Sequence, residues 1–311
     1  DTVAYKNLVP GKQYLVFGQL FEKKTGEDGE TAGEPLEVDG KPVIGYAIFT
    51  PESANGTVDV TFTFDSLALK DDTQLVVYEA LFGYDKPMSA DAISKMVPFD
   101  VDRPSTPEYP FLAEHADIND LGQTVTIRNP HITTTALDGV DMNKNVVTDD
   151  ESVIIDTVSY ENLVPGKQYT LKGSVQVKKT DKDGKVTAEP LEVDGKPVTA
   201  ETTFTPEKSE GTANVTFQFS SRDLKPGTEL VVFESLERDG NVLVTHDSIE
   251  DVNQTVTVIV PSIATTALDG TDADKNVVTD DESVIVDTVE YKNLVPGKEY
   301  VAKGQLYLKD T

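Results

Sequence analysis

The sequence contains no cysteine and no tryptophan among its 311 residues, and it has only three histidines. Without cysteine the chain forms no disulfide, and it has no thiol for nucleophilic catalysis or zinc binding. No apolar run is long enough to span a bilayer. Lysine and arginine number 27 against 55 aspartates and glutamates, so the formal net charge is −28. Such an acidic surface repels nucleic acid and anionic membranes, and we expect neither as a partner.

What the chain does contain is an internal repeat, the feature to establish before any other. The stretch DTVAYKNLVPGKQY at 1–14 returns with small changes at 156–169 and 287–300. ITTTALDG at 132–139 becomes IATTALDG at 263–270, an offset of 131 residues. A repeat of that length matches a whole domain and is too long for one unit of a solenoid.

The repeat predicts three segments arranged in tandem, within a chain that is expected to be monomeric. Only residues 130–260 form a complete unit. Residues 1–129 lack the opening strand, and residues 261–311 contain only the N-terminal part of a third unit. Pro130 and Pro261 open the second and third segments, which predicts short, stiff joins between the domains.

The first segment carries 24 residues that have no counterpart in the second, and they lie within about 82–114. This insertion is rich in proline and includes a short helix-like stretch, SADAISKM. Surface loops generally tolerate insertions, but binding loops occur at the same kind of position. Two interpretations therefore stay open, a structurally neutral loop and a loop that contacts a partner.

The complete unit alternates apolar and polar residues in stretches such as QYTLKGSVQVKK and GTANVTFQFS. Turn sequences, among them VPGK, DKDGK and KPGT, separate these stretches. Seven or so short strands in about 130 residues predict an all-β fold. We expect tandem antiparallel β-sandwich domains of the immunoglobulin-like type.

Two polar features recur within the repeats. The stretches HADINDLGQT at 115–124 and HDSIEDVNQT at 246–255 each place a histidine eight residues before a glutamine. A glutamate, Glu79 or Glu234, follows four apolar residues in the runs LVVYE and LVVFE. A glutamate on a buried strand costs stability unless it has a partner. Recurrence at one spacing favours a functional role for these residues over chance turn positions.

Taken together, the motifs of this chain resemble the VaFE repeat of Gram-positive surface adhesins. The chain matches it in V-x-F-E at 231–234, in I-x-T-T-A on the first strand, in D-T-V-x-Y, and in H-x(7)-Q-T on the last strand. The resemblance covers the whole chain. It implies CnaB-type sandwich domains, each closed by an intramolecular ester bond between a threonine and a glutamine.

The resemblance assigns Thr134 and Gln254 as the cross-linked pair of the second segment. Three threonines run consecutively at 133–135, and strand alternation separates the middle one from its neighbours without choosing between the two faces. Gln123 of the first segment and Thr265 of the third would be the halves of incomplete pairs. The assisting residues implied are Asp156, Glu234 and His246 in the second segment, Asp1, Glu79 and His115 in the first, and Asp287 in the third.

The chemistry explains why these residue types would be needed. A threonine hydroxyl is a weak nucleophile that requires a base, and a glutamine amide leaves as ammonia only when its nitrogen is protonated. A histidine beside carboxylates can serve both steps, and a buried carboxylic acid can donate a hydrogen bond to the amide oxygen. We expect one self-directed turnover without a cofactor, and not an enzyme that acts on other molecules.

Two other covalent or catalytic hypotheses are weaker. No G-x-S-x-G, H-E-x-x-H or P-loop pattern supports a hydrolase or a nucleotide-binding enzyme. A Lys–Asn isopeptide bond through Lys172 and Asn253 is disfavoured because these positions become Phe17 and Gly122 in the first segment.

The acidic loops at 138–152 and 269–283 also deserve a comparison with calcium-binding loops. They lack the glycine and the final glutamate of an EF-hand, so a solvated acidic hairpin is favoured over a metal site. No metal is therefore expected.

The resemblance implies a structural stalk, in which cross-linked domains hold a binding tip away from a Gram-positive cell wall. We expect an extracellular, cell-wall-anchored protein whose other parts contact a host surface protein or glycan. The cross-linked threonine and glutamine of a domain would lie on its first and last strands, the two strands that a pulling force loads. The alternative is a host-ligand binding module that uses the insertion at 82–114.

Overall fold

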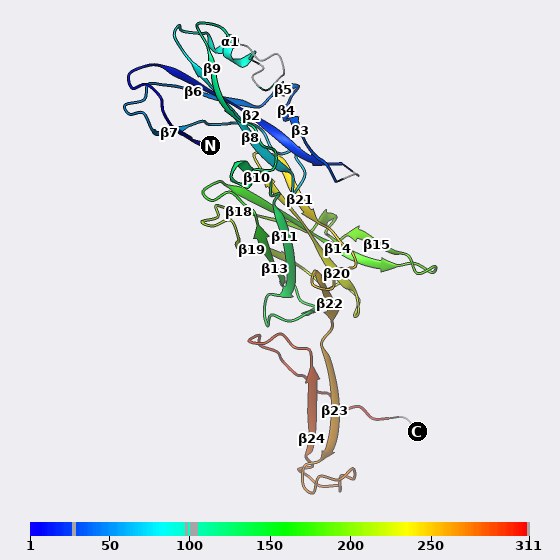
Figure 1. The fold of residues 1–311 in the computed structure, drawn as a ribbon. Coiled ribbons are helices and arrows are strands. Elements are labelled where there is room, and N and C mark those ends of the chain that lie inside the picture. Colours follow the sequence, from blue (N-terminus) through cyan, green and yellow to red (C-terminus); the bar gives the residue numbers. More distant parts are fainter. Residues whose placement is uncertain (27–28, 97–98, 100–104, 310–311) are drawn as a thin grey trace. The chain divides into compact units, whose positions relative to one another are not determined.

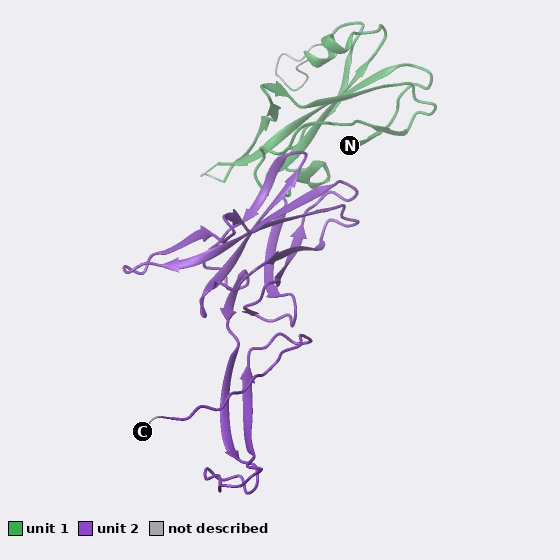
Figure 2. Cartoon of the chain, turned by 180° about the vertical axis from the view of Figure 1, so that it is seen from behind, with its two compact units in different colours: residues 1–129 green, residues 130–311 purple. Residues whose placement is uncertain are grey.

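The structure is a computed structural model that describes residues 1–26, 29–96, 99 and 105–309. Its chain divides into two compact units, residues 1–129 and residues 130–311 (Figure 2). Strands dominate both units, and the tandem all-β sandwich architecture predicted from the sequence is confirmed (Figure 1). Within the described residues, no helix is both long enough and apolar enough to cross a membrane.

Residues 130–260 fold as two sheets. The smaller sheet has the antiparallel order β11-β13-β19, formed by His131–Asp138, Ser152–Glu161 and Gly211–Phe219. The larger sheet has the order β12-β22-β20-β14-β15, with β18 paired to β14 and β21 paired to β20. Its strands are β12 (Asn145–Val147), β14 (Tyr169–Thr180), β15 (Val186–Pro190), β18 (Thr199–Phe204), β20 (Glu229–Arg238), β21 (Asn241–His246) and β22 (Thr255–Ile259), and β16 (Glu192–Val193) with β17 (Lys196–Pro197) forms a small separate hairpin.

The core of this domain lies between the two sheets. Alternate residues of β13 are buried, as the period of two in a strand requires. Ile154, Val158 and Phe217 of the smaller sheet pack with Leu171 and Val232 of the larger one. Burial of these side chains fixes which face of each strand points inward, and so fixes the register of the polar residues between them.

One pairing departs from the antiparallel expectation. The short strand β12 runs parallel to β22, with Val146 opposite Val258. Both valines are fully buried, so the segment after β11 is held against the last strand of the domain by its apolar side chain. This contact brings the loop between β11 and β12 next to the start of β22.

The first unit repeats this plan without the strand that corresponds to β11. A two-stranded sheet pairs β1 (Thr2–Tyr5) with β7 (Gly56–Asp59), where the second unit has three strands. A six-stranded sheet has the order β10-β8-β2-β3, with β6 and β9 on its branches. These strands are β2 (Tyr14–Thr25), β3 (Thr31–Pro35), β6 (Ile44–Phe49), β8 (Gln74–Gly83), β9 (Phe111–His115) and β10 (Thr124–Thr126), beside the hairpin β4 (Glu37–Val38) with β5 (Lys41–Pro42) and the 3-10 turn η1 (Leu121–Gln123).

The insertion lies between β8 and β9, and its residues 97–98 and 100–104 fall outside the described part of the chain. Its helix-like stretch forms α1 (Ala90–Ser94), which buries Ile93. Ile93 packs with Phe17 and Phe82 on the face of the sheet. In the second unit the same positions carry Lys172 and Glu237, which form an ion pair of 2.6 Å. The insertion therefore covers an apolar sheet face that the second domain leaves polar.

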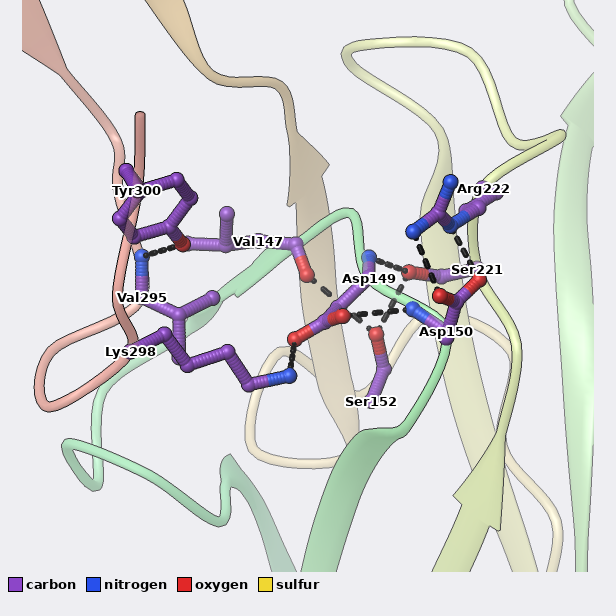
Figure 3. Close-up of polar contacts among 9 residues, drawn as sticks. All are labelled: Val147, Asp149, Asp150, Ser152, Ser221, Arg222, Val295, Lys298 and Tyr300. Atoms are coloured by element: carbon purple, nitrogen blue, oxygen red, sulfur yellow. Dashed lines mark hydrogen bonds and ion pairs between the residues drawn. The ribbon is translucent and has the colours of Figure 1, made fainter. Parts of the chain in front are cut away.

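The third segment begins with a hairpin of β23 (Ser262–Asp269) and β24 (Ile285–Lys292). In the turn that follows, the Val295 amide donates to the Tyr300 hydroxyl at 2.9 Å, as the Val164 amide does to Tyr169 in the second domain. Figure 3 shows this turn against the second domain, where Lys298 donates to the Asp149 carboxylate.

Candidate functional site

Thr134 lies on β11 with its side chain in the core. Along this strand Ile132, Thr134 and Ala136 are buried, whereas Thr133 and Thr135 are exposed. Alternation alone could not select the face, and the burial of Ile132 and Ala136 selects it here. Of the three consecutive threonines, Thr134 alone points into the domain.

Asp156 lies beside Thr134 on the neighbouring strand. Residue Ala136 of β11 is paired with Asp156 of β13, and the aspartate is fully buried. The Ala136 amide also donates to the Asn253 carbonyl at 2.9 Å. This hydrogen bond joins the smaller sheet to the segment that precedes β22, so the threonine strand and the glutamine segment meet at one edge of the sandwich.

Gln254 is fully buried and is held at both its backbone and its side chain. Its carbonyl accepts from the Val232 amide at 3.0 Å, and its side-chain Nε2 donates to the His246 carbonyl at 3.0 Å. The side-chain nitrogen is therefore oriented toward β21, while Oε1 has no hydrogen-bond partner.

Glu234 lies on β20, opposite Gly173 of β14 and His246 of β21. A Cβ atom at Gly173 would overlap both the Glu234 carboxyl and the Phe217 ring. Glycine at this position therefore leaves the space that the buried carboxyl occupies. The histidine is more accessible, with 22% of its side chain exposed, and its Nε2 lies 3.2 Å from Asp251 Oδ2.

Nine buried side-chain polar atoms in the described part of the chain have no hydrogen-bond partner, and all belong to residues that the sequence singled out. Thr134 and Glu234 lie near enough to Asp156 to shift its pKa, yet none of the three meets hydrogen-bond geometry. Unsatisfied buried groups cost roughly 1–3 kcal/mol each, so such clustering indicates a functional site. The residues are Glu79, Gln123, Thr134, Asp156, Glu234, His246 and Gln254.

Burial raises the pKa of Asp156 to about 6 and the pKa of Glu234 to about 9. The charge of Asp156 adds to the increase at Glu234, because two carboxylates in one buried site repel. The Thr134 hydroxyl and the Lys144 ammonium oppose the increase in the pKa of Asp156. At neutral pH the pair therefore holds one proton, which gives the site a carboxylate base beside a carboxylic acid.

Sequence reasoning missed two residues of this site, Asp251 and Lys144. Asp251 faces His246, and its counterpart Asp120 lies 2.8 Å from His115 Nε2 in the first unit. The recurrence of aspartate five residues after each histidine was a signal that could have identified it. Lys144 belongs to the acidic loop after β11, where a lone lysine reads as a solvated residue.

The first unit brings together only part of the predicted set. Glu79 is buried opposite His115, and Gln123 is half-buried with an unpartnered Oε1. Half of the His115 side chain, 51%, is exposed. Asp1 is exposed and its amino group donates to the Val60 carbonyl at 2.8 Å. Without a strand equivalent to β11, the described unit places no threonine against Gln123.

The third segment contains the other half of the pattern. Thr265 lies opposite Val289 and Ala267 opposite Asp287, the register that β11 and β13 have in the second domain. Thr265 and Asp287 are both exposed, since the described residues of this segment supply no second sheet to cover them. The hairpin therefore has the same register as β11 and β13 in the described residues, without a covering sheet.

The model of one family matches three stretches, residues 1–127, 130–258 and 261–311, which together span nearly the whole chain. That family is described as the T-Q ester bond containing domain. The chain belongs to this family. No curated protein sequence matches it significantly.

Two solved structures resemble this T-Q domain protein remotely. A bacterial adhesin from Mobiluncus mulieris, with intramolecular disulfide, isopeptide and ester bond cross-links, is 16% identical over 53% of this chain and 76% of its own, with a TM-score of 0.32. The T6 backbone pilin of Streptococcus pyogenes is 10% identical over 88% of this chain and 66% of its own, with a TM-score of 0.20. Neither match is close enough to support an argument about function.

The sequence also raised a metal site and an isopeptide bond as alternatives for this T-Q domain protein. Among the described residues, no group of three or more histidine, aspartate or glutamate side chains is arranged to hold a metal ion. Lys172, the isopeptide candidate, has half of its side chain exposed and is paired with Glu237 instead.

Replacing Glu79 with glutamine is expected to stabilise the first T-Q domain at alkaline pH but not at acidic pH. Burial raises the pKa of Glu79 to about 7 in the folded chain, above its ordinary value of 4.5. As pH rises from about 4.5 to 7, the unfolded chain ionises first, so the parent loses stability that the neutral glutamine retains. The expected gain at pH 8 is on the order of 2 kcal/mol, since one pKa unit corresponds to about 1.4 kcal/mol and solvent access reduces the full effect.

Thermal unfolding of the first domain at pH 4 and pH 8 measures this difference. The exposed Glu52→Gln is the matched control and should show no pH-dependent gain. Equal stabilisation by Glu79→Gln at both pH values would mean that ionisation of Glu79 does not limit stability.

Proposed function

We propose that residues 130–260 form an intramolecular ester between Thr134 and Gln254. The observation that carries this proposal is the group of buried, unpartnered polar atoms gathered around Thr134 and Gln254. An ester would remove the Thr134 O–H donor and the Gln254 amide nitrogen, and would leave a threonine oxygen that needs no hydrogen-bond partner. It would also join the first and last structural elements of the domain core.

The Asp156 carboxylate is the base that accepts the proton of the Thr134 hydroxyl. The freed oxygen attacks the side-chain carbonyl carbon of Gln254, and the protonated Glu234 donates a hydrogen bond to the oxygen on which negative charge develops. His246, paired with Asp251, delivers a proton to the departing nitrogen. The C–N bond breaks and ammonia is released. Asp156 has taken one proton from Thr134 and His246 has given one to the leaving nitrogen, so the site neither gains nor loses a proton overall.

The tertiary fold supplies most of the rate in this scheme. Thr134 and Gln254 are 120 residues apart in the chain but are fixed on elements joined by the hydrogen bond from Ala136 to Asn253. Holding two reacting groups in place replaces a bimolecular encounter and is worth several orders of magnitude in rate. Burial of both groups keeps water from the ester once it has formed. The reaction occurs once per domain, so this protein is not an enzyme in the ordinary sense.

The biological role that fits this chemistry is a stalk. We infer that the tandem domains form part of an extracellular adhesin that is anchored to a Gram-positive cell wall, with ligand binding assigned to other parts of the protein. A covalent bond between the first strand and the last carries a pulling force that would otherwise load hydrogen bonds. It also closes each domain without cysteine, so reducing conditions do not open it.

Intact mass of the purified chain tests the ester. The parent is expected to weigh less than its sequence by the mass of one ammonia, whereas Thr134→Ala and Gln254→Ala should have their full calculated masses. Thr133→Ala and Thr135→Ala are matched controls, because these neighbours lie on the same strand but are exposed, and both should keep the deficit. A parent chain of unmodified mass, after folding is verified, would contradict the proposed function.

A further inference from the structure

Lys144 links the two elements that carry the reacting residues. Its Nζ donates to the Ala136 carbonyl at 2.7 Å and to the Asn253 carbonyl at 2.6 Å. Ala136 lies two residues after Thr134 on β11, and Asn253 immediately precedes Gln254. One ammonium therefore holds together β11 of the smaller sheet and the segment that leads into β22 of the larger sheet.

The surroundings of Lys144 keep it in this position. Burial lowers the pKa of its ammonium, and the nearby Asp156 and Asp251 carboxylates oppose that decrease. The Lys144 carbonyl also accepts from the Thr257 amide at 2.7 Å, which ties its backbone to β22. Both its ends are thus engaged at the junction of the two sheets.

The third segment shows that the threonine strand alone orients this lysine. Lys275, the counterpart of Lys144, donates to the Ala267 carbonyl at 2.6 Å, although the described residues of this segment include no glutamine segment beside it. Ala267 is the counterpart of Ala136 and lies two residues after Thr265. The contact of this lysine with the threonine strand therefore does not depend on the contact with the glutamine segment.

The acidic loop supplies the geometry that aims the lysine. In the second domain the Asp138 side chain accepts from the Val140 amide at 2.7 Å, and Met142 has a positive φ of 58°. In the third segment the Asp269 side chain accepts from the Thr271 amide at 2.6 Å, and Ala273 has a φ of 62°. The same loop conformation recurs in both copies, with the lysine two residues after the positive-φ position. The recurring conformation of the loop therefore serves to direct the lysine toward the threonine strand.

We propose that Lys144 is a positioning residue for ester formation, which docks the glutamine segment onto a preformed threonine strand through its two carbonyl contacts. This inference rests on the proposed function. It predicts that the ammonium acts on the rate at which Thr134 and Gln254 reach attacking distance, and not on the chemistry of the reacting atoms.

Cell-free synthesis of the full chain, followed by intact mass at successive times, measures the rate of ammonia loss. Lys144→Met keeps the length of the side chain without its donors and is expected to react at least about tenfold more slowly, the effect of losing hydrogen bonds from a charged donor. Lys144→Arg keeps the positive charge and offers several N–H donors to the two carbonyls, so it should recover most of the parent rate. Lys275→Met makes the same change in a segment without a glutamine partner and should react like the parent.

Each outcome decides a separate point. A folded Lys144→Met chain that loses ammonia at the parent rate overturns the role of Lys144. If circular dichroism shows that Lys144→Met does not fold, Lys144→Gln takes its place, because glutamine is shorter and carries no charge. A folded Lys144→Gln chain that loses ammonia at the parent rate would then overturn the role of Lys144. A parent that never loses ammonia contradicts the ester itself, whereas a reactive parent with equally reactive variants contradicts only the positioning role of Lys144.

Discussion

Thr134→Ala is expected to lower the free energy of unfolding of the domain at 130–260 by about 4 kcal/mol. A cross-link that closes a loop of about 100 residues restricts the unfolded chain, and by analogy with a disulfide of that span it stabilises by roughly 4–5 kcal/mol. Guanidinium unfolding of the parent and the variant, followed by circular dichroism, measures the difference.

A double-mutant cycle separates the bond from the side chains. Gln254→Ala should lose about as much stability as Thr134→Ala, and the double variant should lose little more, because either change alone removes the same bond. Thr135→Ala, an exposed neighbour on β11, should stay within about 0.5 kcal/mol of the parent. A reducing agent should change none of these values. Additive losses in the double variant would show that the two residues act independently.

Glu234→Gln is expected to slow ester formation by up to about 10²–10³-fold, the usual cost of weakening a donor to a developing oxyanion. Glutamine fills the space left by Gly173, but its amide N–H is a weaker hydrogen-bond donor to the developing oxyanion than the hydroxyl of a carboxylic acid. The measurement is the rate of ammonia loss after cell-free synthesis. Glu79→Gln is the matched control, since it makes the same change at the equivalent strand position of the first unit and should not alter the rate.

The same carboxyl pair predicts the pH dependence of the parent reaction. With burial raising the pKa of Asp156 to about 6 and that of Glu234 to about 9, the reactive form carries one proton between them. Below about pH 6 Asp156 gains a proton and no longer accepts one from Thr134. Above about pH 9 Glu234 loses the proton that stabilises the developing charge. The rate should therefore be highest between these values, which belong to the pair as a unit, and a flat profile would contradict this assignment.

The insertion in the first unit packs against the sheet of its own domain, a contact that the sequence did not indicate. Its proline content and its position favoured either a neutral loop or a contact loop. In the described residues Ile93 covers Phe17 and Phe82 of the sheet, two positions that are polar in the second domain. These strand residues and the insertion therefore form one hydrophobic cluster. A single position such as Phe17, where the second domain has Lys172, could not reveal this, because the two partners are far apart in sequence.

The sequence by itself determined the repeat, the β-sandwich class and the recurring residues, because repetition and a period of two are properties of the chain alone. It did not determine which of three threonines points inward. Burial of Ile132 and Ala136 decided that, since only a second sheet distinguishes one face of a strand from the other. The tertiary structure also placed the Lys144 ammonium on two backbone carbonyls, one on β11 and one in the segment before β22, and backbone acceptors leave no mark in a side-chain pattern.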